Sequence, residues 1–283
     1  MKRVLIALIL GCVGSGVAAF AASAQDAPPR VTVTRLDCGT IQVNDLDQFS
    51  DTRAYVGRSK TLANSCYLIR HGDELMLWDT GLPAALKGRP TTAGEPMSAT
   101  MTATLPEQLA RLGVRPEQIG RIGVSHFHFD HIGQAASFPR ATLLLGAGDW
   151  TAISAPEPDK RLQPDALRPW ISGGSKVDPV QGDRDVFGDG TVQMINLPGH
   201  TPGHHGLLVK LARRGHVLLT GDQAHFTENY QSEGVPRFNT DRADTLASFK
   251  RFKDLARNLK ATVIIQHEPA DVAKLPAFPQ AAD

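Results

Sequence analysis

The stretch SHFHFDH at residues 125–131 is the most informative part of the chain, because it places three histidines and one aspartate within six residues. It follows the apolar run IGV at 122–124, which predicts a strand ending at about 125. Side chains two positions apart on an extended chain point the same way, so His126 and His128 are placed to hold one metal ion. Asp130 and His131 come after a bend and can face a second ion with one hard oxygen and one imidazole nitrogen.

Three more candidate ligands stand where other predicted strands close, namely His200, Asp222 and His267. Two metal ions need more than four ligands, and these residues supply the remainder. They lie far apart along the chain, so the fold must bring them together. A single histidine is usually satisfied by ordinary hydrogen bonds. The three histidines and the aspartate at 126–131 would each need a separate partner at the end of one strand, so shared metal ions explain them better.

The rest of the chain predicts an α/β domain, because short β-branched segments alternate with helical ones and no repeat of roughly 20–50 residues is found. Strands are expected at 31–37, 66–70, 74–78, 122–125, 141–145, 191–196, 205–211, 217–220 and 262–266. Helices are expected at 105–112, 148–153 and 241–259, the last with apolar residues at spacings of three and four. Long loops at 43–60, 83–104 and 155–185 are expected to wall a binding site.

The first 24 residues show the order of a cleavable secretory signal: Lys2 and Arg3, an apolar run over 4–10, and the small residues ASA at 22–24. We expect cleavage after Ala24, which leaves a domain of residues 25–283 in the periplasm or outside the cell. A membrane-spanning helix is the alternative, but the apolar stretch falls short of the roughly 20 residues that a span needs. A lipoprotein signal ending at Cys12 is a weaker alternative.

Charge and cysteine content narrow the class of partner. Formal charge is +1, from 30 basic and 29 acidic residues, and it becomes −1 once Lys2 and Arg3 are removed. No basic stripe is visible, so nucleic acid is not an expected partner, and no stable membrane anchor is expected after cleavage.

Cys38 and Cys66 would be exposed to an oxidising compartment after export. The sequence does not decide whether they form a disulfide or remain two free thiols. They are a poor metal pair, because no second soft ligand lies near either.

The complete set of candidate ligands resembles the metallo-β-lactamase superfamily, whose H-x-H-x-D-H motif and distant His, Asp and His are met in order. The resemblance implies a four-layer αβ/βα sandwich with two zinc ions at one sheet edge. One zinc would be held by three histidines and the other by an aspartate and two histidines, with one more aspartate bridging the ions. In that order the ligands are His126, His128 and His200; Asp130, His131 and His267; and Asp222. Asp79, in WDTG at 78–81, matches a family element that supports a ligand histidine.

Within the superfamily, the chain resembles the N-acyl homoserine lactonases. The segments CGT at 38–40, SCYLI at 65–69, PGHTPGH at 198–204, LLTGD at 218–222 and QHEP at 266–269 are similar to that branch. True β-lactamases generally lack an aspartate at the position of Asp222, and diiron members carry a carboxylate where His128 stands. The resemblance implies that a metal-bridging hydroxide opens the lactone, with Asp130 carrying a proton to the leaving oxygen.

One position departs from the well-known lactonases, which place a tyrosine shortly after the bridging aspartate where this chain has His225. Asp130, Asp222 and His225 are therefore the catalytic candidates. His225 either orients the substrate carbonyl or packs beneath the loop at Phe226; in the second case Tyr230 or the metals alone would take that role. The remaining histidines are expected in turns, in the core or beside the ligands: His71, His204, His205 and His216.

The expected partner is a small lactone or ester, and the oligomeric state, including a homodimer, is left open. Weak candidates for contact with an acyl chain are Met97, Met101, Trp150, Trp170 and Phe226, since scattered apolar residues usually belong to the core. Two alternatives remain: hydrolysis of another ester, lactone or β-lactam, and a periplasmic zinc-binding or ligand-binding protein without catalysis.

Overall fold

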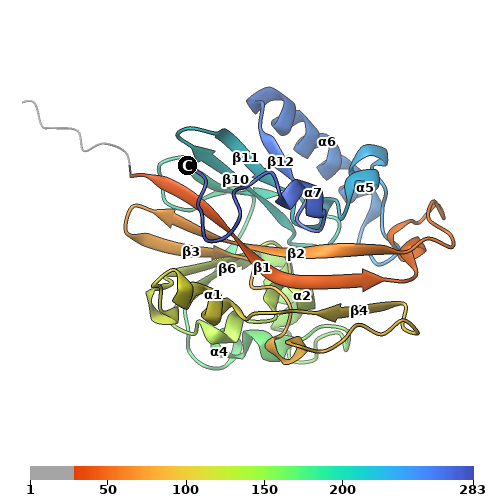
Figure 1. Ribbon diagram of the computed structural model, residues 1–283, viewed down its shortest axis with the longest axis horizontal. Helices are drawn as coiled ribbons and strands as arrows, with labels where there is room; N and C mark the ends of the chain where they lie inside the picture. The colour runs from red at the N-terminus through yellow and green to blue at the C-terminus, as the bar shows by residue number, and fades with distance from the viewer. Residues whose placement is uncertain (1–28) are drawn as a thin grey trace, which may run out of the picture.

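Two β-sheets packed face to face form the centre of the molecule in a computed structural model that describes residues 29–283. Figure 1 shows helices α1 and α4 on the outer side of one sheet and α6 on the outer side of the other. The expected four-layer αβ/βα sandwich is therefore confirmed. The expected secretory signal at 1–24 lies outside the described residues.

The larger sheet has seven strands in the order β4-β1-β2-β3-β5-β6-β7. Strands β1, β2 and β3 form an antiparallel meander, after which β3, β5, β6 and β7 run parallel. Parallel neighbours need crossover connections, and these carry the helices to one face of the sheet. The strands are β1 (Val31–Val43), β2 (Lys60–His71), β3 (Glu74–Trp78), β4 (Met97–Thr100), β5 (Arg121–Val124), β6 (Thr142–Gly146) and β7 (Val177–Val180).

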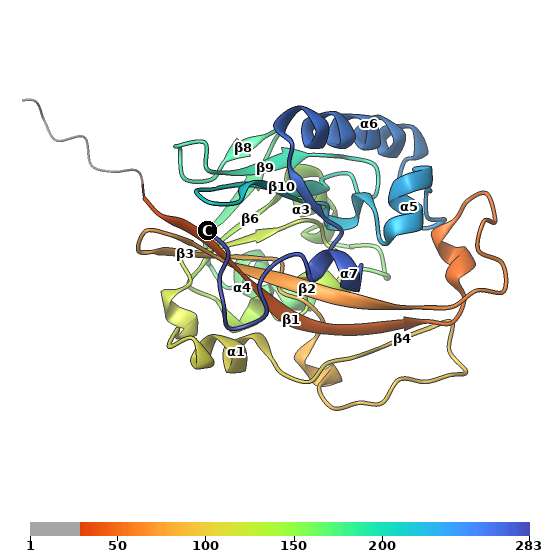
Figure 2. The ribbon, with the colours of Figure 1, turned by 45° about the horizontal axis from the view of Figure 1, so that its top comes forward.

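The smaller sheet has five strands in the order β12-β11-β10-β9-β8. Strands β9, β10 and β11 are antiparallel neighbours, and β12 follows α6 and pairs parallel to β11. Figure 2 shows α6 on the outer face of this sheet. As a result β9, β11 and β12 all end at the same edge. The strands are β8 (Arg184–Asp185), β9 (Val192–Asn196), β10 (His205–Leu211), β11 (Gly215–Leu219) and β12 (Thr262–Ile264).

The long helix α6 follows from local signals in its sequence. The Asp241 side chain accepts a hydrogen bond from the Asp244 N–H at its start, and Lys260 ends it in the left-handed conformation. Its buried Phe249 and Phe252 face the smaller sheet. The other helices are α1 (Leu105–Arg111), α2 (Phe129–Ile132), α3 (Ala147–Ile153), α4 (Arg168–Ile171), α5 (Thr227–Ser232) and α7 (Pro269–Val272), with α6 spanning Arg242–Leu259. No helix within residues 29–283 is long and apolar enough to cross a membrane.

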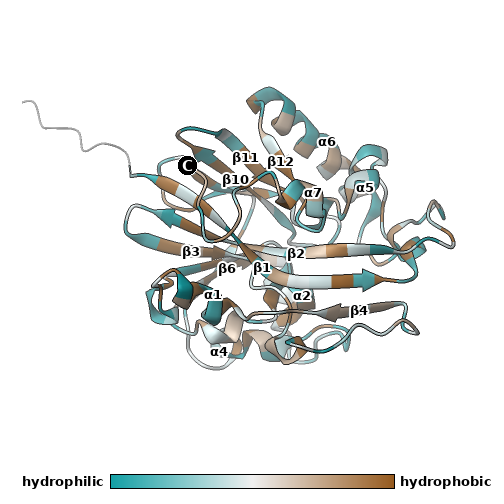
Figure 3. Cartoon of the chain, viewed as in Figure 1, coloured by the Kyte–Doolittle hydropathy of each residue, from teal (hydrophilic) through white to brown (hydrophobic). Residues whose placement is uncertain are grey.

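The core consists of apolar layers on both faces of the two sheets, and Figure 3 shows more brown on the central strands than on the outer helices. Tyr67, Trp78 and Leu207 are among the buried residues between the sheets. Leu77, Leu143 and other residues of the larger sheet pack against the helices below it. Because both faces of the central strands are buried, the strand ends are held in fixed positions, and those ends carry the candidate ligands.

Three edge strands lie inside stretches that were expected to be loops. The range 83–104 contains β4, and the range 155–185 contains α4, β7 and β8, so these loop predictions were wrong in part. Strand β7 reads Val-Asp-Pro-Val, and a proline is tolerated only where the missing N–H is not needed, at a sheet edge. Strand β4 is also an edge strand, and its sequence Met-Ser-Ala-Thr lacks a clear apolar alternation.

A disulfide joins Cys38 to Cys66 across β1 and β2, which resolves the question that the sequence left open. The two Cα atoms lie 5.8 Å apart, within the usual range for a disulfide. The bond sits at a bulge of β1, where the register shifts between Asp37 and Gly39. Both sulfur-bearing residues are fully buried.

Candidate metal centre

Strands from both sheets end at one place, and the seven candidate ligands sit there. The larger sheet contributes four of them, two directly after β5 and two within α2. The smaller sheet contributes three, after β9, β11 and β12. In this order they are His126, His128, Asp130 and His131, followed by His200, Asp222 and His267.

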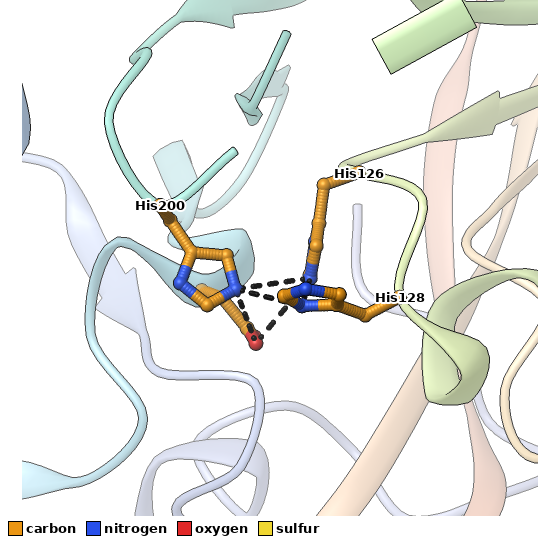
Figure 4. Close-up of side chains that lie close together, drawn as sticks. His126, His128 and His200 are labelled. Carbon is orange, nitrogen blue, oxygen red and sulfur yellow. Dashed lines mark hydrogen bonds and ion pairs between the residues drawn. The ribbon is translucent and has the colours of Figure 1, made fainter. Parts of the chain in front are cut away.

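The first group consists of four ligand atoms around one point. Figure 4 shows the rings of His126, His128 and His200 converging there. His126 Nε2 lies 2.8 Å from His128 Nδ1 and 3.2 Å from His200 Nε2, and the last two nitrogens are 3.0 Å apart. Asp222 Oδ2 lies 3.5 Å from His126 Nε2 and 3.3 Å from His200 Nε2. Ligand atoms of a tetrahedral zinc with bonds of about 2.0–2.1 Å are about 3.3–3.4 Å apart, so this set fits one ion.

The second group shares Asp222 with the first. His131 Nε2 and His267 Nε2 are 3.3 Å apart, and Asp222 Oδ1 lies 3.2 Å from the first and 2.9 Å from the second. Asp130 Oδ2 completes the group at 3.6 Å from His131 Nε2 and 3.7 Å from His267 Nε2. Because the two oxygens of Asp222 face different groups, its carboxylate is placed to bridge two ions.

Burial and charge prepare both groups for cations. Burial holds the pKa of His126 and of His128 well below the usual value, which favours the neutral imidazole that a metal requires. Burial also acts on His131, but the carboxylates of Asp222 and Asp130 outweigh it and raise the pKa of His131. The histidines around Asp222 hold the pKa of its carboxyl well below the usual value despite burial. The neutral imidazoles of the first group and the carboxylates of Asp130 and Asp222 in the second are donors that suit a metal ion.

The geometry agrees with what comparison with known proteins finds. Residues 60–267 match the family model described as the metallo-beta-lactamase superfamily. The chain belongs to this superfamily.

Named relatives within the metallo-β-lactamase superfamily come from several bacteria. An N-acyl homoserine lactonase AttM of Rhizobium radiobacter is 30% identical over 190 residues, covering 61% of this chain and 68% of the relative. An N-acyl homoserine lactonase of a Bacillus species is 29% identical over 222 residues, covering 76% of this chain and 85% of the relative. The solved structure of a quorum-quenching N-acyl homoserine lactone hydrolase superposes with a TM-score of 0.76 and 25% identity, covering 90% of this chain and 99% of that one.

Three ligand histidines of this superfamily member are oriented through their second ring nitrogen. His131 Nδ1 lies 2.9 Å from Asp79 Oδ2, which confirms the predicted support by Asp79. His200 Nδ1 lies 2.8 Å from Asn239 Oδ1. His267 Nδ1 lies 2.8 Å from the carbonyl oxygen of Ala63. An Nδ1–H that donates to oxygen leaves Nε2 free to bind a metal.

Two further buried side chains, Asp149 and His204, hold the ligand loops. The sequence did not single out Asp149, whereas His204 was expected in the core or beside the ligands. Asp149 accepts hydrogen bonds from the Phe127 N–H, the Thr201 hydroxyl and the Gly203 N–H, so it ties the loop after β5 to the loop after β9. His204 Nε2 accepts a hydrogen bond from the backbone N–H of Asp222 at 2.9 Å. This contact agrees with the expectation that His204 lies beside the ligands.

A cavity of about 380 Å³ opens onto the two groups of the superfamily site. Asp130 and Asp222 reach its surface, and all three expected loop ranges contribute walls. Among the side chains lining it are Ile41, Gln48, Phe49, Leu62, Met97, Phe127, Phe129, Asp159, Arg161, Leu162 and Phe238.

Of the five weak candidates for acyl contact, Met97 lines this cavity. The other four belong to the apolar core or pack against it, as scattered apolar residues usually do. Met101 and Phe226 are fully or almost fully buried beneath the loops that wall the cavity, and Trp170 is buried on the helical side of the larger sheet. Trp150 is half-buried against the same side.

His225 lines the cavity and is 3% exposed. Its Nε2 lies 3.0 Å from Asp222 Oδ2, but neither ring nitrogen has a hydrogen bond of good geometry within the described residues. Its ring meets Phe49 edge-on with centroids 4.8 Å apart. Tyr230 does not line this cavity and packs against Phe252 instead, with ring centroids 6.1 Å apart. His225 is thus a polar side chain beside Asp222 that faces the cavity and has spare hydrogen-bonding capacity.

Proposed function

We propose that this chain is a dizinc hydrolase that opens the lactone ring of N-acyl homoserine lactones. The observation that carries the proposal is the pair of ligand groups joined by Asp222 at the base of a largely apolar cavity. Relatives named N-acyl homoserine lactonases, several of them 30% identical, support the substrate class. Zinc is supported by the donor set of imidazoles and carboxylates at tetrahedral spacing.

The proposed ligands are the seven side chains of the two groups. His126, His128 and His200 would hold one zinc, Asp130, His131 and His267 the other, and Asp222 both. Two zinc ions there would polarise the lactone carbonyl and supply a water nucleophile at neutral pH. The neutral imidazoles of His126 and His128 support binding of a cation at the first group, and the low pKa of Asp222 supports binding at both groups.

The chain's own side chains then position the substrate and move a proton. Asp130 reaches the cavity surface, where its carboxyl can carry a proton to the departing ring oxygen. His225 has a ring nitrogen available for the substrate carbonyl. The acyl chain would lie along the apolar wall, where Phe49, Met97 and Phe238 exclude water from the ester bond.

Export is part of the proposal. The charged start, the apolar run and ASA at 22–24 support a secretory signal, and the mature domain would be residues 25–283. The disulfide between Cys38 and Cys66 supports an oxidising compartment such as the periplasm, because disulfides are rare where thiols are kept reduced.

A substrate panel and a metal analysis test the proposal together. The mature protein, purified without chelator, should contain about two zinc ions per chain, and His126→Ala should lower this content. It should hydrolyse N-acyl homoserine lactones of short and long acyl chain in preference to aryl esters and a chromogenic β-lactam. Lactone opening is measured by the release of protons. Turnover confined to the esters or the β-lactam would assign another hydrolase, and two bound zinc ions with no turnover would favour a binding protein.

A further inference from the structure

Gln266 is a fully buried glutamine that immediately precedes the candidate ligand His267. It follows β12 of the smaller sheet, yet its amide reaches residues at the end of β3 in the larger sheet. It does not line the cavity, so it has no direct route to a substrate.

The Gln266 amide uses every hydrogen-bonding position that it has. Its Oε1 accepts from the Trp78 indole N–H at 3.1 Å and from the Gly221 backbone N–H at 2.9 Å. Its Nε2 donates to Asp79 Oδ2 at 2.8 Å and to the Ser65 carbonyl at 3.4 Å. Two donors and two acceptors in this arrangement match a glutamine and no other side chain of this shape, because a glutamate could not donate.

Two of the contacts of Gln266 lead to members of the second group. Asp79 Oδ2 receives the Gln266 amide and also faces His131 Nδ1 at 2.9 Å. Gly221 directly precedes the bridging Asp222. It has φ of +54°, and a Cβ there would meet His204 Nε2 at 2.6 Å, so this turn is built tightly. Gln266 is therefore connected to three of the four ligands in that group: to His131 through Asp79, to Asp222 through Gly221, and to His267 as the next residue in the chain.

We infer that Gln266 is the positioning residue of the second metal group. It fixes the Asp79–His131 pair, the Gly221–Asp222 turn and His267 relative to one another, and so sets the spacing of the ligand atoms. The inference rests on the proposed two-metal function but is independent of the substrate. It differs from a merely structural role, which would add stability without favouring either metal group.

Two substitutions separate positioning from stability. Gln266→Leu removes all four hydrogen bonds at similar volume, and Gln266→Glu keeps the shape but sets a second carboxylate against Asp79. Gln108→Leu is the matched control, because Gln108 is also a buried glutamine, bonded to the backbone N–H and carbonyl of Asp37. Stepwise zinc dissociation constants are measured by competition with a chromophoric chelator. His126→Ala and His267→Ala identify which step belongs to which group.

Both Gln266 variants should weaken zinc binding at the second group by roughly 10–100-fold, with a smaller loss at the first group, which shares only the bridging Asp222 with the contacts of Gln266. Gln108→Leu should lower the melting temperature and leave both binding steps unchanged. Wild-type binding at both groups in the Gln266 variants, or equal weakening of both groups, would overturn the inference. If Gln266→Leu fails to fold, Gln266→Glu decides by the same criterion. Fewer than two binding steps in the wild-type protein would instead contradict the proposed two-metal function.

Discussion

His225 combines burial with spare hydrogen-bonding capacity beside the bridging Asp222. If its imidazole orients the substrate carbonyl, His225→Ala should leave the zinc content unchanged. The rate on a homoserine lactone should then fall by roughly 10- to 1,000-fold, the range expected for one lost hydrogen bond to a developing oxyanion. His225→Tyr should keep part of the activity, since a phenol can also donate. Steady-state kinetics and elemental analysis check this, and unchanged kinetics with a lower melting temperature would assign His225 to packing against Phe49.

Asp149 provides a second prediction for a single residue, this time for stability against pH. Burial raises its pKa to about 7, although three donors face its carboxyl. The unfolded chain has a pKa near 3.9 for aspartate, so the folded state binds more protons between about pH 4 and 7. Wild-type stability from this group is therefore lost as pH rises through that window, by about 1.4 kcal/mol per pH unit.

Asp149→Asn cannot titrate, so its free energy of unfolding relative to the wild type should rise across the same window. Urea unfolding of the two metal-free proteins between about pH 5 and 8 measures the difference. A constant offset at every pH would reflect only the altered hydrogen bonds. Such a result would contradict a raised pKa for Asp149.

The ligand residues could be found from the sequence because each is of a metal-binding type and stands at or shortly after the end of an apolar run. The groups that orient these ligands by hydrogen bonds could not be found in this way. His267 is oriented by the backbone carbonyl of Ala63, and every residue has such a carbonyl. Asn239 and Gln266 stand in stretches whose composition gives no sign of their partners, because those partners lie in other parts of the chain. Asp79 was predictable through the resemblance of its WDTG segment and not through its own chemistry.

Strands β1 and β2 carry a prediction at the level of secondary-structure elements. The disulfide between Cys38 and Cys66 closes a loop with a sequence separation of 28 residues and fixes the pairing beside a bulge. Replacing both with alanine should lower the free energy of unfolding by about 3–4 kcal/mol, mainly because the unfolded chain gains freedom. Urea unfolding checks this, with reductant added to the wild type as a second route to the same loss. Equal midpoints for wild type and double variant would show that strand packing alone fixes the pairing.

Elements with a strong apolar pattern were predictable, and short or marginal ones were not. The bounds of β3 and β10 agree with the expected ranges, and α6 begins one residue later than expected. The edge strands β4 and β7 were missed because an edge strand needs neither alternation nor a full set of N–H donors. The single-turn helices α2 and α7 were missed because so short a helix is stabilised by tertiary contacts and not by its own sequence.

At the level of the whole molecule, we predict that the chain is exported and cleaved after Ala24. The mature protein recovered from a periplasmic fraction should begin at Gln25, and measurement of its intact mass checks this. The oxidised Cys38–Cys66 pair should appear in the same spectrum as a loss of two hydrogens. A full-length cytoplasmic chain, or a lipid on Cys12, would contradict the prediction.

Both ligand groups draw on both sheets: His126 and His128 from the larger one meet His200 from the smaller, and His131 meets His267. Neither half of the chain holds a complete set, so bound metal ions would cross-link the two sheets. Separating the sheets would then require breaking bonds to metal at both groups, and exchange of backbone amide hydrogens at the inner faces should slow when zinc is added. Two fragments of the chain, divided between the sheets, should associate in proportion to the zinc supplied, because the metal centre would also stabilise the fold.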